Sequence, residues 1–191
     1  MSARAIYLIG LPACGKTTLG RALPAAARRL GVEGLRFEDL DEAVEAAEGR
    51  SIAEIFRSEG EEAFRRAESA LLRGISEGPD SGGILVLACG GGTPCSGDNL
   101  EYMLSRGLVV ELRATREATL RRLLEAPPEQ RPLVGKVHGD PGALSDEVEA
   151  LAARRRPWYS LAHASFDSTL LETEEQVRET SEAFVRQFIL N

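Results

Sequence analysis

The residues G-L-P-A-C-G-K-T-T at positions 10–18 decide the fold, because they follow an apolar run at residues 5–9 and precede an amphipathic segment. They match the pattern G-x-x-x-x-G-K-[ST] of a phosphate-binding loop, which joins a buried strand to a helix. In such a loop, successive backbone N–H groups and the positive end of the helix point at a bound polyphosphate. The stretch therefore predicts a nucleotide-binding domain that opens with a strand, this loop and a helix.

The composition fits one globular domain spanning residues 1–191, with 43% hydrophobic and 28% charged residues. A net charge of −7 argues against a general nucleic-acid binder, so any anion must be captured by local clusters of arginine. No apolar run approaches the length of a membrane span, and Gly10 and Pro12 interrupt any secretion signal. We therefore expect a cytoplasmic protein with neither a membrane nor a nucleic-acid partner.

Strand and helix patterns alternate along the chain. They predict strands at residues 4–9, 34–38, 84–88, 108–112 and 165–169, and helices at 15–30, 40–47, 51–58, 61–77, 98–106, 116–125, 145–162 and 174–189. The uninterrupted apolar run at residues 84–88 is typical of a central parallel strand covered on both faces. Together the elements predict an α/β fold of three layers, with a central five-stranded parallel sheet and helices on both faces. Ligands should then gather at the carboxyl ends of the strands.

Residues 126–142 break the alternation, because their prolines and glycines forbid a long helix or strand. Long loops in compact domains are usually functional or irregular. We favour a mobile lid over the site, because Arg131 within it could swing over a phosphate. The alternative is a surface loop with no role in the site.

The phosphate side of the predicted site combines the loop with two carboxylates. Among 23 lysine and arginine residues only Lys16 and Lys136 are lysines, and a compact ammonium at position 16 suits a triphosphate better than a guanidinium. The Thr17 hydroxyl is a candidate ligand for Mg²⁺, and Asp39, after the second strand, can reach the same ion. Asp41 can accept a proton or a hydrogen bond from a substrate hydroxyl. The alternative for both aspartates is a solvated helix N-terminus.

Three further features predict a pocket for a small carboxylate. Arg65 and Glu68 lie one helical turn apart, so the glutamate can fix the guanidinium with two parallel N–H donors on its free edge. The glycines at residues 90–92 leave the backbone open to a close approach by a ligand. Arg155 lies near the end of a helix, where Pro157 pins its direction. The alternatives are an ordinary surface ion pair and a basic helix end.

In combination these motifs resemble the shikimate kinases. The order and spacing of that family are matched by the phosphate loop, F-x-D-x-D at 37–41, the segment 51–68, G-G-G at 90–92, R-P-L at 131–133 and R-R-P-W-Y at 155–159. The segment 90–103 is similar to one branch of the family, and the whole resemblance covers residues 4–190. It implies transfer of the γ-phosphoryl group of ATP to the 3-hydroxyl of shikimate, with Mg²⁺, in aromatic amino-acid (chorismate) biosynthesis. The alternatives are another small-molecule kinase, such as a gluconate kinase, and a non-catalytic nucleotide-binding relative.

The resemblance also implies a role for each candidate residue. Lys16, Asp41 and Arg131 would act in catalysis, and Thr17 and Asp39 would hold the metal. ATP would be bound by Gly10, Ala13, Cys14, Gly15, Lys16, Thr17, Thr18, Arg122 and Arg131, with Arg121 an equal match for Arg122 against adenine. Shikimate would be bound by Asp41, Arg65, Gly90, Gly91, Gly92 and Arg155. Residues 39–77 would form the substrate-binding helical segment, and we expect a monomer, because kinases of this type are often monomeric.

Two residues of the phosphate loop depart from the family's pattern. Ala13 replaces a glycine that is common there, and Cys14 is a less usual neighbour. Neither change removes a backbone N–H group, so intact phosphate binding is expected.

Overall fold

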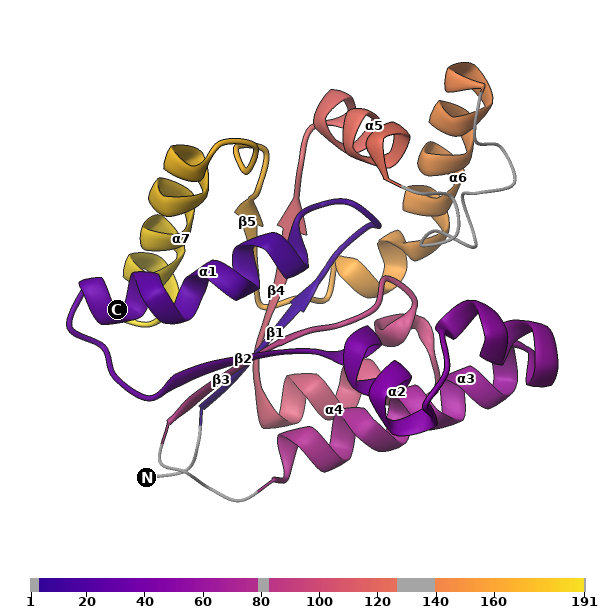
Figure 1. The fold of residues 1–191 in the computed structure, drawn as a ribbon, viewed down its shortest axis with the longest axis horizontal. Helices are drawn as coiled ribbons and strands as arrows, with labels where there is room; N and C mark the ends of the chain where they lie inside the picture. Colours follow the sequence, from indigo (N-terminus) through magenta and orange to yellow (C-terminus); the bar gives the residue numbers. More distant parts are fainter. Residues whose placement is uncertain (1–3, 79–82, 127–139, 191) are drawn as a thin grey trace.

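The computed structural model of the chain describes residues 4–78, 83–126 and 140–190. Its strands form one sheet in the order β2-β3-β1-β4-β5, and every pairing is parallel (Figure 1). The strands are β1 (Arg4–Ile9), β2 (Leu35–Asp39), β3 (Ile84–Ala88), β4 (Gly107–Arg113) and β5 (Ala164–Asp167). The predicted five-stranded parallel sheet is therefore confirmed.

Seven α-helices and one short 3₁₀ helix lie within the described ranges. They are α1 (Lys16–Arg29), α2 (Leu40–Glu48), α3 (Ile52–Ser76), η1 (Thr93–Cys95), α4 (Asn99–Arg106), α5 (Arg116–Glu125), α6 (Pro141–Tyr159) and α7 (Glu174–Phe188). None of these helices has both the length and the apolar composition that a bilayer span requires. Most bounds lie within two residues of those expected from the sequence, since apolar periodicity and capping signals agree in most elements.

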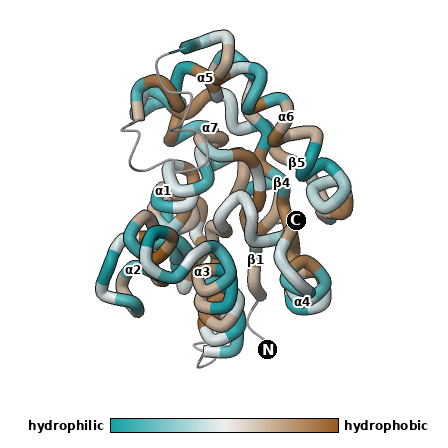
Figure 2. The backbone as a smooth tube through the Cα atoms, turned by 90° about the vertical axis from the view of Figure 1, so that its right-hand side faces the viewer, coloured by the Kyte–Doolittle hydropathy of each residue, from teal (hydrophilic) through white to brown (hydrophobic). Residues whose placement is uncertain are grey.

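Helices cover both faces of the sheet, as the three-layer prediction requires (Figure 1). α1 and α7 pack on one face, where Ile6 and Leu8 of β1 share a core with Phe184 of α7. α3 and α4 pack on the other face, where Tyr7 of β1 shares a core with Met103 of α4. Successive β1 side chains thus enter opposite cores. Figure 2 shows the same arrangement, with hydrophobic residues along β1 and hydrophilic residues on the outer sides of the helices.

One helix is longer than the sequence predicts. The expected helices 51–58 and 61–77 run together as α3, with Gly60 at φ 82° and ψ 176° forming a kink between them. Gly60 thus interrupts the helical geometry between the two predicted ranges, but the two pieces stay continuous around it.

The start of α6 corrects the prediction for the lid. α6 begins at Pro141 instead of residue 145, because the Asp140 side chain accepts hydrogen bonds from the N–H groups of Gly142 and Ala143. Proline is favourable in the first turn of a helix, where its missing N–H is not needed. Residues 141–142 are thus helical and not part of a loop, and α6 ends at Tyr159 instead of residue 162. The rest of the predicted lid, with Arg131, falls at residues 127–139, outside the described residues.

Candidate active site

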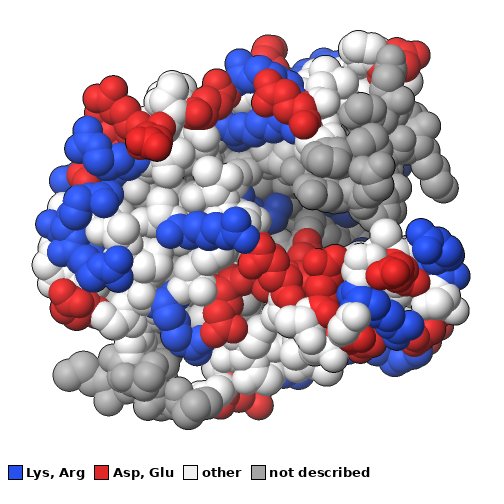
Figure 3. Space-filling view, in the orientation of Figure 1, with Lys and Arg blue, Asp and Glu red and all other residues white. Residues whose placement is uncertain are grey.

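A cavity of about 910 Å³ opens at the carboxyl ends of β2 and β3, beside the loop that follows β1. Figure 3 shows this face of the molecule hollowed near its middle, with basic and acidic side chains around the hollow. The cavity brings together most of the residues that the sequence singled out. Those that line it are Ala13, Gly15, Lys16, Thr17, Thr18, Asp39, Asp41, Arg65, Gly90, Gly91, Gly92, Arg122 and Arg155.

The phosphate loop joins β1 to α1 at the base of this cavity. The Lys16 Nζ donates hydrogen bonds to the carbonyl oxygens of Gly10 and Leu11, both at 2.9 Å. α1 begins at Lys16, so the positive end of its dipole faces the cavity that its first turn lines. Gly10 and Cys14, two predicted nucleotide contacts, do not line the cavity, and the Cys14 side chain is buried beneath the loop.

Thr17 and Asp39 form an oxygen-rich pair beside the loop. The Thr17 hydroxyl donates to Asp39 Oδ2 at 2.6 Å, while Asp39 Oδ1 accepts from the N–H of Asp41 at 3.0 Å. Asp39 is also the N-cap of α2, so it serves both as a helix cap and as a member of the site. A hydroxyl and a carboxylate are the hard oxygen ligands that Mg²⁺ prefers, and Mg²⁺ takes its remaining ligands from water and phosphate.

Asp41 lies between the phosphate loop and the triple glycine. Burial raises the pKa of its carboxyl group from 3.8 to about 6, and the nearby carboxylates of Asp39 and Glu68 act in the same direction. Lys16 and Arg65 oppose this shift but do not cancel it. A carboxyl group that titrates near neutral pH is suited to exchange a proton or a hydrogen bond with a hydroxyl.

Arg65, which lines the cavity with the phosphate loop, is held by a buried network of hydrogen bonds. Its Nη1 donates to Glu68 Oε2 at 2.8 Å, and Glu68 is completely buried. The other Glu68 oxygen accepts from the Thr93 hydroxyl at 2.5 Å, and the carbonyl of Thr93 accepts from Asn99 Nδ2 at 3.1 Å. A buried carboxylate with these partners fixes the direction of the guanidinium.

The second edge of the Arg65 guanidinium is not free, which corrects the prediction from the sequence. Its Nε and Nη2 donate to Glu61 Oε1 at 3.3 and 3.1 Å. Glu61 lies one turn before Arg65 on α3 and its side chain is 58% exposed, so helical spacing alone explains the pair. A carboxylate already occupies the two donors that a substrate carboxylate would use.

Arg155 of α6 reaches the same place from the other side. A Cβ placed on Gly91 would collide with the Arg155 guanidinium, and one placed on Gly92 would collide with that of Arg65. The Arg155 side chain is buried, and its Nη1 has no hydrogen-bond partner among the described residues. Both arginines thus converge on the triple glycine.

The end of α6 is anchored to the same backbone. The buried Tyr159 hydroxyl donates to the carbonyl oxygen of Gly91 at 2.7 Å, and burial raises the pKa of this phenol, so it remains a donor. Trp158, the only tryptophan of the chain, is 37% exposed beside it.

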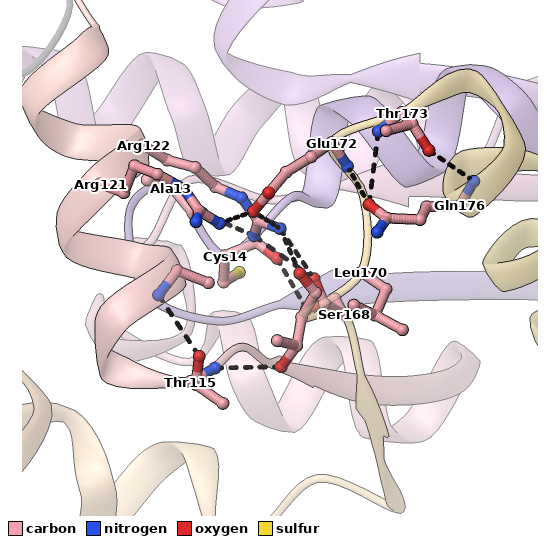
Figure 4. A network of polar contacts seen from close by, with 12 residues as sticks. Ala13, Cys14, Thr115, Arg121, Arg122, Ser168, Leu170, Glu172, Thr173 and Gln176 are labelled. Carbon is pink, nitrogen blue, oxygen red and sulfur yellow. Dashed lines mark hydrogen bonds and ion pairs between the residues drawn. The ribbon is translucent and has the colours of Figure 1, made fainter.

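Arg122 of α5 lines the cavity, but its guanidinium makes contacts that the sequence did not predict. It donates to the carbonyl oxygens of Ala13, Ser168 and Thr169 (Figure 4). Arg121, the alternative match, forms an ion pair with Glu172 and is half-exposed. Arg121 and Arg122 both stay predicted neighbours of adenine.

Sequence reasoning missed Thr93 and Ser168, whose hydroxyls are fully buried beside the site. Thr93 stood within the quoted segment 90–103, but nothing in its spacing indicates a bond to Glu68. Ser168 is 154 positions from Cys14, whose carbonyl it contacts, so no local pattern could have found it.

Comparison with known proteins identifies the family. The family model described as Shikimate kinase matches residues 12–186. The shikimate kinase of Parabacteroides distasonis is 33% identical over 185 residues, which cover 95% of this chain and 97% of that protein. Among solved structures, the shikimate kinase of Bacteroides thetaiotaomicron has a TM-score of 0.80 at 31% identity, covering 96% of this chain and 97% of that one. The Acinetobacter baumannii shikimate kinase in complex with shikimate has a TM-score of 0.76 at 30% identity, covering 97% and 92%. The chain therefore belongs to the shikimate kinase family.

Proposed function

We propose that the protein transfers the γ-phosphoryl group of ATP to the 3-hydroxyl of shikimate, giving shikimate 3-phosphate for aromatic amino-acid biosynthesis. The observation that carries this proposal is the convergence of Arg65 and Arg155 on residues 90–92, in the cavity that Lys16 also lines. ATP is the phosphoryl donor of the family. A related enzyme of known structure holds shikimate, a small carboxylate that also carries hydroxyl groups.

The two arginines would bind the substrate's carboxylate. Arg155 Nη1 is buried without a partner among the described residues, which is costly unless a ligand supplies the acceptor. Arg65 presents two N–H donors in the geometry that Glu61 now uses. Gly90, Gly91 and Gly92 would let the substrate-binding side chains lie close to the backbone, because Asp41, Arg155 and Arg65 take the space that a Cβ at these positions would need.

Asp41 would receive the hydroxyl that is phosphorylated. Its carboxylate form accepts a hydrogen bond from that hydroxyl, orients it, and can take its proton as the phosphoryl group is transferred. Because the pKa of Asp41 is raised to about 6, activity should fall as the pH drops below that value.

The loop would hold the phosphates, with Lys16 balancing the charge that moves during transfer. Gly10, Ala13, Cys14, Gly15 and Thr18 would shape or bind the nucleotide, and Arg122 or Arg121 would lie against adenine. Thr17 and Asp39 would hold Mg²⁺, which supplies neutralising charge to the phosphate oxygens when bound. Arg131 would reach the transferring phosphoryl group from the lid, and its replacement by alanine should lower kcat more than it raises KM.

Several broader expectations belong to the same proposal. We infer one kinase domain over residues 1–191, with residues 39–77 as the substrate-binding segment and a lid that excludes water so that ATP is not hydrolysed. We also infer a cytoplasmic monomer that binds a small molecule and neither nucleic acid nor membrane.

A coupled ADP-release assay tests the function. The purified protein should release ADP from MgATP only when shikimate is added, and NMR should identify the phosphorylated 3-hydroxyl. Gluconate at the same concentration should give no release, because its flexible chain does not match a cavity with two fixed arginines. Release with gluconate alone would identify a different small-molecule kinase, and ATP binding with no release from either acid would identify a non-catalytic relative.

A further inference from the structure

The phosphate loop packs against Ser168 and Leu171, two residues that the proposed reaction does not use. The fully buried Ser168, just after β5, donates from its hydroxyl to the carbonyl oxygen of Cys14 at 2.7 Å. Leu171 of the same segment packs against Gly15, where an added Cβ would meet its Cδ1 at 2.5 Å. Two successive residues of the loop therefore rest on the segment between β5 and α7.

Arg122 holds Ala13, the residue of the loop that precedes Cys14 and Gly15. Its Nη1 donates to the carbonyl oxygen of Ala13 at 3.4 Å, and its Nη2 donates to that of Thr169 at 2.7 Å. Both nitrogens also lie 3.3 Å from the carbonyl oxygen of Ser168 (Figure 4). The guanidinium thus links the loop to the segment after β5, and both are held through their backbones.

Ala13 is the residue of the loop that most needs such support. Its φ is +60°, and it is the only residue other than glycine with positive φ in the described part of the chain. An alanine in this conformation is strained, and the strain persists only when the surroundings fix it. Its methyl group packs against the cluster of Leu123 and Leu144, so α5 and α6 hold its side chain while Arg122 holds its carbonyl.

We propose that Arg122 is a positioning residue for the phosphate loop, which keeps Ala13 in its left-handed conformation and thereby sets the affinity for the polyphosphate. This rests on the proposed function only in taking the ligand to be a nucleoside triphosphate. Because Arg122 belongs to α5 (Arg116–Glu125), the same contacts also tie the loop to this helix.

A role in stacking on adenine predicts a different outcome. The hydrogen bonds of Arg122 use the edges of its guanidinium and leave its faces open, so the positioning role and stacking are compatible. Inorganic tripolyphosphate separates them, because it presents the phosphates without a base. A loss of tripolyphosphate affinity on removing Arg122 cannot arise from stacking.

The experiment is isothermal titration calorimetry of tripolyphosphate with wild type and Arg122→Ala. We expect the dissociation constant to rise about tenfold, since the hydrogen bonds from a charged group to three carbonyl oxygens are lost. Arg122→Lys should recover part of that loss. Ser168→Ala, which cannot touch the ligand, should raise the constant about threefold. Arg121→Ala is the matched control, because it removes the same charge from the preceding residue, and it should change tripolyphosphate affinity less than about twofold.

A second substitution shows whether Arg122 acts through Ala13. Glycine adopts positive φ without strain, so the loss of tripolyphosphate affinity caused by Arg122→Ala should be smaller in an Ala13→Gly background. The KM for shikimate should stay near wild type in Arg122→Ala, which general damage to the fold would not allow.

The proposal is overturned if Arg122→Ala binds tripolyphosphate like wild type, or if the loss is the same with and without the Ala13→Gly substitution. A third outcome separates the two proposals. If wild type binds tripolyphosphate, Arg122→Ala weakens that binding, and wild type releases no ADP with shikimate, the proposed function is rejected while the role of Arg122 is supported.

Discussion

The two ends of the cavity are held in place by different chemistry. At the phosphate end, Lys16, Arg122 and Ser168 all donate to backbone carbonyl oxygens of the loop. At the other end, where Arg65 and Arg155 converge on residues 90–92 and which we call the acid end after the substrate's carboxylic acid, Arg65 is held by the side chain of Glu68. Glu68 is held in turn by the side chain of Thr93. The contacts at the phosphate end therefore depend on where the loop's backbone carbonyls lie, whereas those at the acid end depend on which side chains are buried there.

This difference explains where the sequence can vary. Ala13 and Cys14 are the two positions where we expected a departure from the family's pattern, and the contacts that fix them reach their carbonyl groups, which every residue has. Replacing Glu68 or Thr93 would instead remove the contact itself. Substitutions should therefore act on ATP or on shikimate separately, according to the end they touch.

Lys16→Ala should have the largest effect and should be confined to the phosphate end. We expect kcat to fall at least about 1,000-fold, because no other described cation approaches the same carbonyls of the loop to replace its charge. Steady-state ADP release measures this loss. The affinity for shikimate, measured by calorimetry, should stay within about twofold of wild type. Weakened shikimate binding would show that the two ends are not separate.

Asp41→Asn tests the residue between the two ends. The amide keeps the shape of the side chain but cannot take a proton, so kcat/KM should fall at least about 100-fold. In the wild type, kcat/KM should drop as the pH falls through about 6, the raised pKa of this carboxyl group. A profile that stays flat between about pH 5 and about pH 8 would contradict the role of Asp41.

The same substitution has an opposite effect on stability. The folded-state pKa of about 6 lies above the ordinary value of 3.8, so the folded protein holds an extra proton between these values and loses stability as the pH rises through them. Asp41→Asn removes this loss and should stabilise the protein by about 3 kcal/mol near pH 7.5, with a much smaller change near pH 4. Denaturant unfolding at both pH values measures the difference. Glu42→Gln, an exposed neighbour, is the control and should show no such gain.

Arg65→Ala should act on the acid end alone. We expect the KM for shikimate to rise about 30-fold, since the variant loses a bidentate partner and leaves the buried Glu68 without its cation. The KM for ATP should barely change. Arg66→Ala is the matched control, because this neighbour is exposed and pairs only with Glu62 among the described residues. An equal rise in KM for both substrates would contradict a role of Arg65 in binding shikimate alone.

Thr93→Val should give a smaller effect of the same kind. The isosteric variant removes one donor from Glu68, which weakens the fixing of Arg65 and should raise the KM for shikimate about fivefold. Thr93→Ser, which keeps the hydroxyl, should restore most of the affinity. A Ser variant no better than Val would mean that packing, and not the hydrogen bond, is what Thr93 supplies.

Glu61→Gln should give the smallest effect and the opposite sign. Its exposed carboxylate occupies the Arg65 donors that we propose bind the substrate, so the variant should lower the KM for shikimate about twofold. Initial rates at low shikimate concentration measure this gain. Glu62→Gln, one residue further along, should leave the KM unchanged, and a higher KM for Glu61→Gln would show that Glu61 orients Arg65 instead of competing for it.

The sequence predicted the fold closely because its signals are local. The apolar run Ile84–Ala88 matches β3 without error, and α5 has the predicted bounds. The start of α6 was placed four residues late, because a Pro141 after Asp140 was taken for a loop signal when it is a helix start.

The candidate site was predicted residue by residue but not contact by contact. Motifs placed Arg65, Arg155 and Lys16 correctly in one cavity, since each follows from spacing near a strand or helix end. The contacts of Thr93 and Ser168 depend on which chain segments meet in three dimensions, and no pattern within one segment carries that information. The pair of Glu61 with Arg65 is different, because its i, i+4 spacing within α3 is a local pattern that the sequence does carry.

The placement of Trp158 gives the protein its own optical reporter. The only indole of the chain lies on α6 one helical turn beyond Arg155, and its neighbour Tyr159 is bonded to the carbonyl of Gly91. We therefore expect its emission to change when α6 shifts against the triple glycine. Titrations followed by this emission would test, without a label or a coupled enzyme, whether α6 responds when a ligand enters the cavity.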